Sequence, residues 1–292
     1  MTTSPSLSRS NVRQLLEEDG AAHDLTTLAL ISPKATASAQ IVAKAAGIIA
    51  GVDVAIQVFR TVDPSLRFRI SRRDGTRVRP GQTILTIRGR TRSVLAAERT
   101  ALNFLGHLSG VATLTDEFVR RTQGTRANIY DTRKTIPGLR ALQKYAVRIG
   151  GGRNHRMGLH DAVLIKTNHL LAYSRQHTAP RNAIKAAIAQ AKRKTKRQFV
   201  EVEVGNMVEF KAALAAKPNV ILLDNWPLQK IKKAVYVRSC LPSAVCCVLE
   251  VSGGVSLKNV RAIARTGVDR ISIGQLTHSA PSLDLSLQIT KP

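Results

Sequence analysis

The chain has 292 residues, of which 43% are hydrophobic, so it can bury one large core or two smaller ones. No apolar run approaches the roughly 20 residues of a membrane-spanning helix, and the N-terminal MTTSPSLSRSNVRQLLEEDG lacks the apolar core of a signal peptide. The composition therefore argues against a membrane protein and favours a cytoplasmic one.

The charge balance is strongly basic, with 45 Lys and Arg against 19 Asp and Glu and a formal net charge of +26. Such a surplus attracts polyanions, nucleic acid among them. The basic residues are scattered along the whole chain, however, and aromatic residues, which would stack on bases, make up only 4%. The charge alone is thus a weak argument for a nucleic-acid-binding protein, and its scatter argues against nucleic acid as the main partner.

The first part of the chain mixes helix and strand signals. A helical stretch at 11–20 precedes strand-like residues at 39–52, and residues 74–89 predict two short strands joined by an Arg-Pro-Gly turn. Residues 93–122 then carry leucines at helical intervals, which predicts a long helix.

After residue 126 the pattern alternates between strands and helices. Strand-like segments are ANIYDT, AVLIK, FVEVEV, VILLDN, CVLEVSG and RISIG, and helical stretches separate most of them. This alternation predicts parallel β/α units and an α/β fold class. A β/α barrel is the favoured architecture, and a doubly wound sheet is the alternative.

The six predicted strands end in polar residues or glycine. The residues at or just after these ends are Asp131, Arg133, Lys134, Lys166, Glu203, Asp224, Ser252-Gly253-Gly254 and Gly274. Both candidate architectures place their sites at the carboxyl ends of the strands. The sequence therefore predicts that these residues share one polar cleft.

The predicted cleft has both positive and negative groups. Arg133, Lys134 and Lys166, with His155 and Arg156 from the loop GGGRNHRMG, supply donors for an anion with several negative groups. The Ser-Gly-Gly turn precedes a helix, where backbone N–H groups bind phosphate.

Two of the strand-end residues are carboxylates. Glu203 and Asp224 suit a divalent metal on phosphates, or hydroxyl groups. Glu201 alternates with Glu203 and so points to the same face, where at least one could pair with a lysine. Lys166 could instead be a Schiff-base lysine, and each of these residues taken singly also has a purely structural interpretation.

Several blocks of the sequence carry a family resemblance. They are EEDGAAHDLTT, KAAGIIAGV, ERTALNFLGHLSGVATLT, DTRKTIPGLR, KYAVRIGGGRNHRMGL, AVLIKTNH, EVEV, LLDN, LEVSGGV and GVDRISIGQLTHS. In this order they resemble the quinolinate phosphoribosyltransferase family, also called nicotinate-nucleotide pyrophosphorylases, over nearly the whole chain. The resemblance implies an N-terminal α/β sandwich domain at 1–112, joined by the C-terminal segment 276–292, and an incomplete, TIM-like α/β barrel at 113–275.

The resemblance also implies an activity. Members of this family transfer phosphoribosyl from phosphoribosyl pyrophosphate to the ring nitrogen of quinolinate, and carbon dioxide and pyrophosphate leave. Nicotinate mononucleotide for NAD biosynthesis is the product, Mg²⁺ the cofactor, and a homodimer at minimum the expected assembly.

The expected site residues follow from the matching blocks. Quinolinate would be bound by Arg99 of the neighbouring subunit and by Thr132, Arg133, Lys134, His155, Arg156 and Lys166. Phosphoribosyl pyrophosphate would be bound by Glu203, Asp224, Ser252, Gly253, Gly254, Ser272, Gly274 and His278. The catalytic set would be Lys134, Lys166, Glu203 and Asp224, with Glu203 and Asp224 also holding Mg²⁺ directly or through water.

The chain departs from the family pattern at two positions, and two other functions remain as alternatives. His23 stands where glycine usually precedes the Asp of the early motif, and Thr167 replaces the usual acidic residue beside Lys166.

The alternatives are a related phosphoribosyltransferase-like protein associated with molybdenum transport and a basic nucleic-acid-binding protein on the same scaffold. The role of Asp131 is expected to be orientation of the cations.

Overall fold

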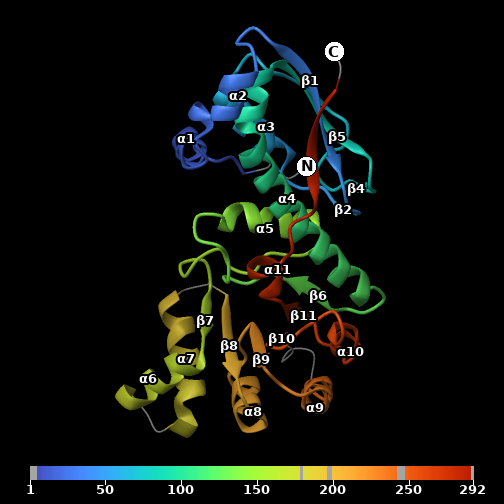
Figure 1. Cartoon of the computed structure of the whole chain (residues 1–292). Helices are drawn as coiled ribbons and strands as arrows, with labels where there is room; N and C mark the ends of the chain where they lie inside the picture. Colours follow the sequence, from blue (N-terminus) through green and yellow to red (C-terminus); the bar gives the residue numbers. More distant parts are fainter. Residues whose placement is uncertain (1–4, 178–179, 196–198, 242–246, 291–292) are drawn as a thin grey trace. The chain divides into compact units, whose positions relative to one another are not determined.

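The computed structural model describes residues 5–177, 180–195, 199–241 and 247–290, and the chain divides into two compact units (Figure 1). Unit 1 comprises Met1–Asp116, Thr135–Gly151 and Gln275–Pro292. Unit 2 comprises Glu117–Lys134 and Gly152–Gly274.

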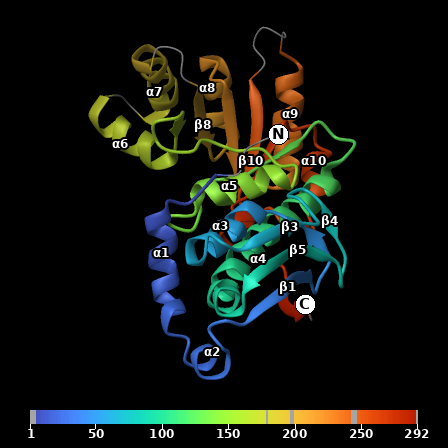
Figure 2. The same ribbon diagram turned by 90° about the horizontal axis from the view of Figure 1, so that it is seen from above.

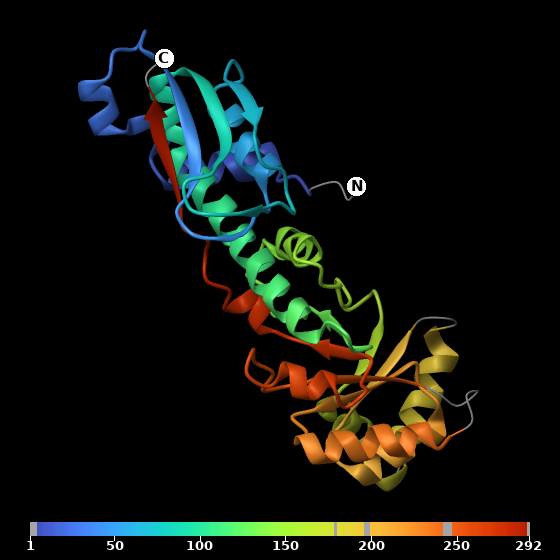
Figure 3. The same ribbon diagram turned by 90° about the vertical axis from the view of Figure 1, so that its right-hand side faces the viewer.

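Unit 1 is built on a four-stranded antiparallel sheet in the order β12-β1-β5-β3. Its strands are β1 (Thr36–Ala43), β3 (Arg67–Ile70), β5 (Thr83–Arg90) and β12 (Leu285–Thr290), and β2 (Gly47–Ile48) pairs with β4 (Arg77–Val78). Strand β12 comes from the end of the chain and lies beside β1 (Figure 3). The segment 276–292 therefore supplies a strand of this sheet.

The helices of unit 1 include one long helix that continues into unit 2. They are α1 (Arg9–Glu18), η1 (Ala21–His23), α2 (Leu25–Leu30), α3 (Val52–Val62), α4 (Thr91–Thr122), α5 (Arg140–Ile149) and α11 (Gln275–His278). Helices α3 and α4 lie next to each other (Figure 2), and the Ala50 N–H donates to Ser109 Oγ at 3.0 Å. His23 ends η1, and Asp24 caps α2 by accepting from the Thr27 N–H.

Residues 135–151 belong to unit 1, although the sequence analysis assigned them to the barrel domain. Their side chains explain the difference. The Tyr145 hydroxyl donates to Asp74 Oδ2 at 2.8 Å, and the fully buried Gln143 bonds to three segments of unit 1. Gly150 also lies so close to α4 that a Cβ would stand 2.3 Å from the Ala112 carbonyl oxygen.

Unit 2 contains six parallel strands in the order β6-β11-β10-β9-β8-β7. These are β6 (Asn128–Tyr130), β7 (Val163–Ile165), β8 (Val200–Val204), β9 (Val220–Asp224), β10 (Val248–Ser252) and β11 (Arg270–Ser272). The helices between them are α6 (Thr167–His177), α7 (Pro180–Thr195), α8 (Met207–Ala216), α9 (Leu228–Ser239) and α10 (Val260–Ala264). The expected α/β class with an incomplete, barrel-like sheet is confirmed.

The register of this sheet aligns the strand ends that the sequence analysis identified. Ser252 pairs with Asp224, and Glu203 pairs with Leu222, two residues before Asp224. All five residues of β8 are buried, as in sheets that are covered on both faces. The polar ends of neighbouring strands therefore lie at one edge of the sheet. In the described part of the chain, no helix is both long and apolar enough to cross a membrane.

Candidate active site

A cavity of about 550 Å³ lies at the carboxyl ends of the strands of unit 2. It is lined by Thr132, Arg133, Lys134, His155, Arg156, Leu164, Lys166, Leu222, Asp224, Asn225, Glu250, Ser252, Gly253, Gly254, Ser272 and Gly274. Twelve of the fifteen predicted site residues are in this wall. The predicted convergence of polar strand ends is therefore found in the structure.

Two guanidinium groups give one side of the cavity its positive charge. Burial lowers the pKa of Arg156, and the neighbouring charge of Arg133 lowers it further. The Arg156 Nη1 donates to the Ala162 carbonyl at 2.9 Å, whereas the buried Nε of Arg133 has no hydrogen-bond partner among the residues that the structure describes. Because unpaired buried donors are costly, this pair of arginines is suited to an anion that would accept their N–H groups.

A lysine and a glutamate form an ion pair across strands β7 and β8. Lys166 Nζ lies 2.6 Å from Glu203 Oε2, and the hydroxyl of Thr167 donates to Glu203 Oε1 at 2.9 Å. Burial raises the pKa of Glu203, but the hydrogen bond and charge of Lys166 and the bonds from Thr167 outweigh it and lower that pKa. Thr167 thus supports Glu203, where an acidic residue would repel it.

Asp224 is held by its neighbours at the end of β9. Its Oδ1 accepts from Ser252 Oγ at 2.6 Å, and its Oδ2 accepts from Asn225 Nδ2 at 2.9 Å. Gly253 has φ +81°, and a Cβ there would lie 2.2 Å from Asn225 Oδ1. The Ser-Gly-Gly turn therefore needs glycine at its second position, because any side chain would displace Asn225.

Two buried carboxylates that were not predicted as site residues lie at the cavity, and one of them, Glu250, lines it. Glu201 and Glu250 are each 1% exposed, and His155 Nε2 lies 3.0 Å from Glu201 Oε2 and 3.5 Å from Glu250 Oε1. Burial, followed by the charge of Glu201, raises the pKa of Glu250 to about 7. The alternation of glutamates on β8 was the only sequence signal for this cluster.

Asp131 lies behind the cavity and is fully buried. Its Oδ1 accepts from the His155 N–H at 2.9 Å, and its Oδ2 accepts from Asn154 Nδ2 at 2.5 Å. Asp131 therefore holds the loop that carries His155 and Arg156, and its role in orienting the cations stays a prediction.

Three predicted residues do not line this cavity. Glu203 reaches it through Lys166. Arg99 and His278 belong to unit 1, where Arg99 lines a separate hollow and His278 Nδ1 lies 2.5 Å from Ser279 Oγ.

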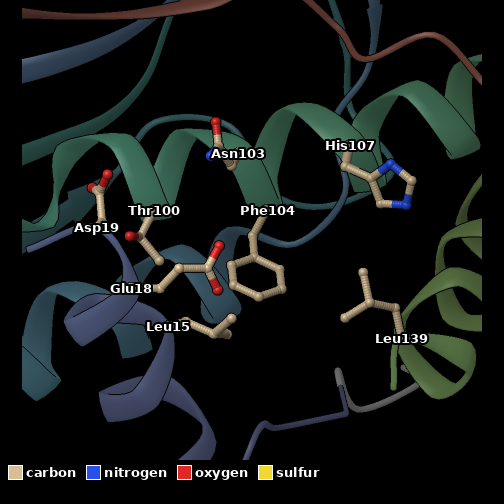
Figure 4. Close-up of a pocket in the computed structure, with 8 residues that line it drawn as sticks. All are labelled: Leu15, Glu18, Asp19, Thr100, Asn103, Phe104, His107 and Leu139. Atoms are coloured by element: carbon tan, nitrogen blue, oxygen red, sulfur yellow. The ribbon is translucent and has the colours of Figure 1, made fainter. Parts of the chain in front are cut away.

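Unit 1 has a further hollow of about 260 Å³ between α1, α4 and Leu139 (Figure 4). Glu18, Asp19 and Thr100 lie at one end, and His107 lies at the other. Burial lowers the pKa of His107, which favours its neutral form. A hollow with two carboxylates and a neutral histidine does not suit an anionic substrate.

Comparison with known proteins gives the same family at both ends of the chain. The family models for the N-terminal and C-terminal domains of quinolinate phosphoribosyl transferase match residues 24–109 and 111–288. A nicotinate-nucleotide pyrophosphorylase [carboxylating] of Mycobacterium leprae is 44% identical over 96% of each chain. A chloroplastic one of Arabidopsis thaliana is 40% identical over 94% of this chain and 80% of its own.

Solved structures agree with these relatives. The nicotinate-nucleotide pyrophosphorylase from Francisella tularensis has a TM-score of 0.84 and 36% identity, covering 99% of this chain and 100% of that one. The enzyme from Ehrlichia chaffeensis has a TM-score of 0.87 and 34% identity, with the same coverage. With both domains matched, the chain belongs to the quinolinate phosphoribosyltransferase family.

Proposed function

We propose that this protein transfers the phosphoribosyl group of phosphoribosyl pyrophosphate to quinolinate, with loss of carbon dioxide, and so makes nicotinate mononucleotide. One observation carries the proposal. A single cavity places Arg133, Lys134, Arg156 and Lys166 together with Asp224 and a Ser-Gly-Gly turn. The family match favours this activity over the molybdenum-transport and nucleic-acid alternatives.

The cations account for the dicarboxylate. Quinolinate carries two carboxylates on adjacent ring carbons, and guanidinium groups bind carboxylates through paired hydrogen bonds. Within the described part of the chain the buried Nε of Arg133 has no hydrogen-bond partner, and the charge of Arg133 lowers the pKa of Arg156. Both features would be relieved by a bound anion. Lys134 and Lys166 extend the positive wall.

Another part of the wall suits the phosphoribosyl donor. Gly253 and Gly254, which follow Ser252 and line the cavity, both have positive φ and leave their backbone N–H groups open to close approach. Asp224 stands next to this turn, where its carboxylate can accept from ribose hydroxyls. Ser272 and Gly274 continue this side.

The two carboxylates also fit Mg²⁺. Each oxygen of Asp224 and of Glu203 accepts a hydrogen bond, and a carboxylate has room for about four such contacts in all. Mg²⁺ usually takes one or two carboxylates and completes its shell with phosphates and water. Asp224, and Glu203 through water, would hold it, and bound Mg²⁺ would neutralise charge on the departing pyrophosphate.

The reaction needs positioning and electrostatic stabilisation. The ring nitrogen forms a bond to C1 of the ribose while the bond from C1 to pyrophosphate breaks, and Asp224 and Glu203 can stabilise positive charge that develops on the ribose. The alkylated ring nitrogen then accepts the electron pair as the bond to the neighbouring carboxylate breaks. A proton from solvent replaces the carbon dioxide. Lys134 and Lys166 keep both anions in place.

The test is a coupled assay for nicotinate mononucleotide and carbon dioxide from quinolinate and phosphoribosyl pyrophosphate. Arg156→Ala should lose at least about 100-fold in kcat/KM, whereas Arg153→Ala, an exposed arginine of the same loop, should stay near wild type. Product without carbon dioxide release, or equal losses in both variants, would count against the proposal.

We further propose a homodimer in which Arg99 completes the cavity of the neighbouring subunit, and a cytoplasmic location. Arg99 is exposed in unit 1, on helix α4. Arg99→Ala and Arg133→Ala should each be inactive. Mixing them under conditions of subunit exchange should restore about a quarter of wild-type activity, because half of the dimers would hold one intact site. No recovery despite proven exchange would argue for a site within one subunit.

A further inference from the structure

Glu250 lines the cavity, Glu201 is buried near it on the other side of His155 Nε2, and the proposed chemistry uses neither. Glu201 Oε1 is buried without a hydrogen-bond partner among the described residues, and the side chain of Ser272 hydrogen-bonds to the carboxyl of Glu250. Burying two carboxylates is costly, so a chain keeps such a pair only where another group compensates for it.

The ring of His155 supplies the nearest donor. Its Nδ1 accepts a hydrogen bond from the N–H of Arg156 at 2.8 Å. A ring nitrogen that accepts carries no proton, so the proton of the neutral ring is on Nε2. That nitrogen is the one at 3.0 Å from Glu201 and 3.5 Å from Glu250. The hydrogen-bond pattern therefore fixes the tautomer of His155.

A metal ion is the alternative occupant of this cluster. The ligand atoms of His155, Glu201 and Glu250 lie within 4.8 Å of one another, close enough to hold one. A protonated Nε2, however, has no lone pair to give to a metal. Arg270 Nη1 also lies 3.9 Å from Glu250 Oε2, so a cation of the protein already faces the pair.

The position of Arg270 is itself fixed. Its guanidinium carbon lies 4.8 Å from the ring centroid of Tyr130 and 5.1 Å from that of Phe199. This stacking between two rings holds the charge against Glu250. The carboxylate pair is thus compensated from one side by Arg270 and from the other by the Nε2–H of His155.

The cluster holds a loop that leads into the cavity. The backbone N–H of His155 donates to Asp131, and the ring Nε2 of His155 contacts Glu201. The ring Nδ1 accepts from the backbone N–H of Arg156. Any rotation of the ring would break the bonds at both nitrogens. We place Arg156 against quinolinate, and the ring of His155 therefore fixes the backbone of Arg156 at its N–H.

We propose that Glu201 and Glu250 are positioning residues, which lock the Nε2–H form of His155 and through it set the carboxylate subsite that Arg156 provides for quinolinate. This inference rests on the proposed function. It predicts a selective effect, because the contact of Glu201 leads through the ring of His155 to Arg156, whereas Asp224 on the phosphoribosyl side is held by Ser252 and Asn225.

The experiment compares Glu201→Gln and Glu250→Gln with Glu209→Gln, a glutamate at the start of α8 in the same unit. In Glu201→Gln we expect the KM for quinolinate to rise about 10- to 100-fold, the KM for phosphoribosyl pyrophosphate to stay within about twofold, and kcat to fall less than the quinolinate kcat/KM. Glu250→Gln should give a smaller change of the same kind. Glu209→Gln should match the wild type. A wild-type KM for quinolinate in Glu201→Gln would overturn the proposal.

A second measurement does not depend on turnover. ¹⁵N NMR of the histidine rings in the free protein should show His155 with its proton on Nε2, and Glu201→Gln should weaken or shift this signature. An unchanged His155 signal in Glu201→Gln would contradict the proposal, as would a bound stoichiometric metal that the variant loses. If the wild type did not turn over quinolinate but had the expected tautomer, the proposed function alone would fail. Should Glu201→Gln not fold, Asp131→Asn would test the same loop through its backbone.

Discussion

Replacing Gln143 by leucine should destabilise unit 1 while leaving the volume of the side chain nearly unchanged. Gln143 is fully buried on α5. Its Oε1 accepts from the Ile136 N–H at 2.9 Å, and its Nε2 donates to the Thr277 carbonyl at 2.7 Å. These two bonds fix the orientation of the amide, so the contact of Nε2 with His107 Nε2 at 2.9 Å is a third bond, and Gln143 donates it.

The expected cost follows from these three bonds. A hydrogen bond contributes about 1 kcal/mol net, and a buried group that loses its partner costs about 1–3 kcal/mol. Because Gln143→Leu would leave three partners without their bonds, the free energy of unfolding should fall by about 3 kcal/mol. The hydrogen bonding of His107 should also change, because its Nε2 would no longer accept a bond from Gln143.

The assay is urea unfolding followed by far-ultraviolet circular dichroism, with Gln40→Leu as the control. Gln40 accepts one bond, from Thr83 Oγ1 at 3.0 Å, in the same unit, so its loss should cost no more than about 1 kcal/mol. A cost for Gln143→Leu no larger than that of the control would refute the idea that Gln143 joins the three segments.

Three further predictions concern unit 2. Gly253→Ala should raise the KM for phosphoribosyl pyrophosphate by at least about tenfold, because the new Cβ would displace Asn225. In the control Gly254→Ala the Cβ meets open space, so the KM should rise less. Equal rises in KM in the two variants would contradict the prediction. Glu250 has a pKa raised from 4.5 to about 7, so its stabilising contribution is present below pH 4.5 and is lost as the pH rises through 7, a change of about 3 kcal/mol. In Glu250→Gln the free energy of unfolding, taken from denaturation curves, should no longer fall between pH 4.5 and 7. A fall that persists in the variant would show that another group causes it. The pKa of Glu203 is lowered, so its contribution to the free energy of unfolding has the opposite pH dependence. That contribution is present above the ordinary pKa of a glutamate and is lost as the pH falls through the folded pKa of Glu203.

The cavity of unit 2 could be predicted from the sequence because parallel strands bring their carboxyl ends to one edge. Asp224 and Ser252 lie more than 25 residues apart in the chain, yet each is the last residue of its strand, and their pairing follows from the register. The cationic residues and the glycine turn at those ends also indicate that the substrates are anions.

The support beneath the cavity could not be predicted in the same way. Alternation on β8 placed Glu201 and Glu203 on one face but did not say which partner each would take. The structure pairs Glu203 with Lys166 and Glu201 with His155, which comes from a loop some 45 residues earlier. Such long-range pairing leaves no local pattern. The assignment of α5 to unit 1 depends on Gln143 in the same manner.

The pairing of β12 with β1 has a consequence for how the protein forms as it leaves the ribosome. Thr290 bonds back to Ser38 across a sequence separation of 252 residues. The antiparallel sheet of unit 1 therefore cannot be complete until nearly the whole chain has been made, whereas every strand of unit 2 has by then emerged. Domains that emerge early generally fold first. Here the earliest residues must wait for the latest ones, so nascent unit 1 has an unpaired edge at β1 for most of its synthesis, and chaperones would be expected to bind there.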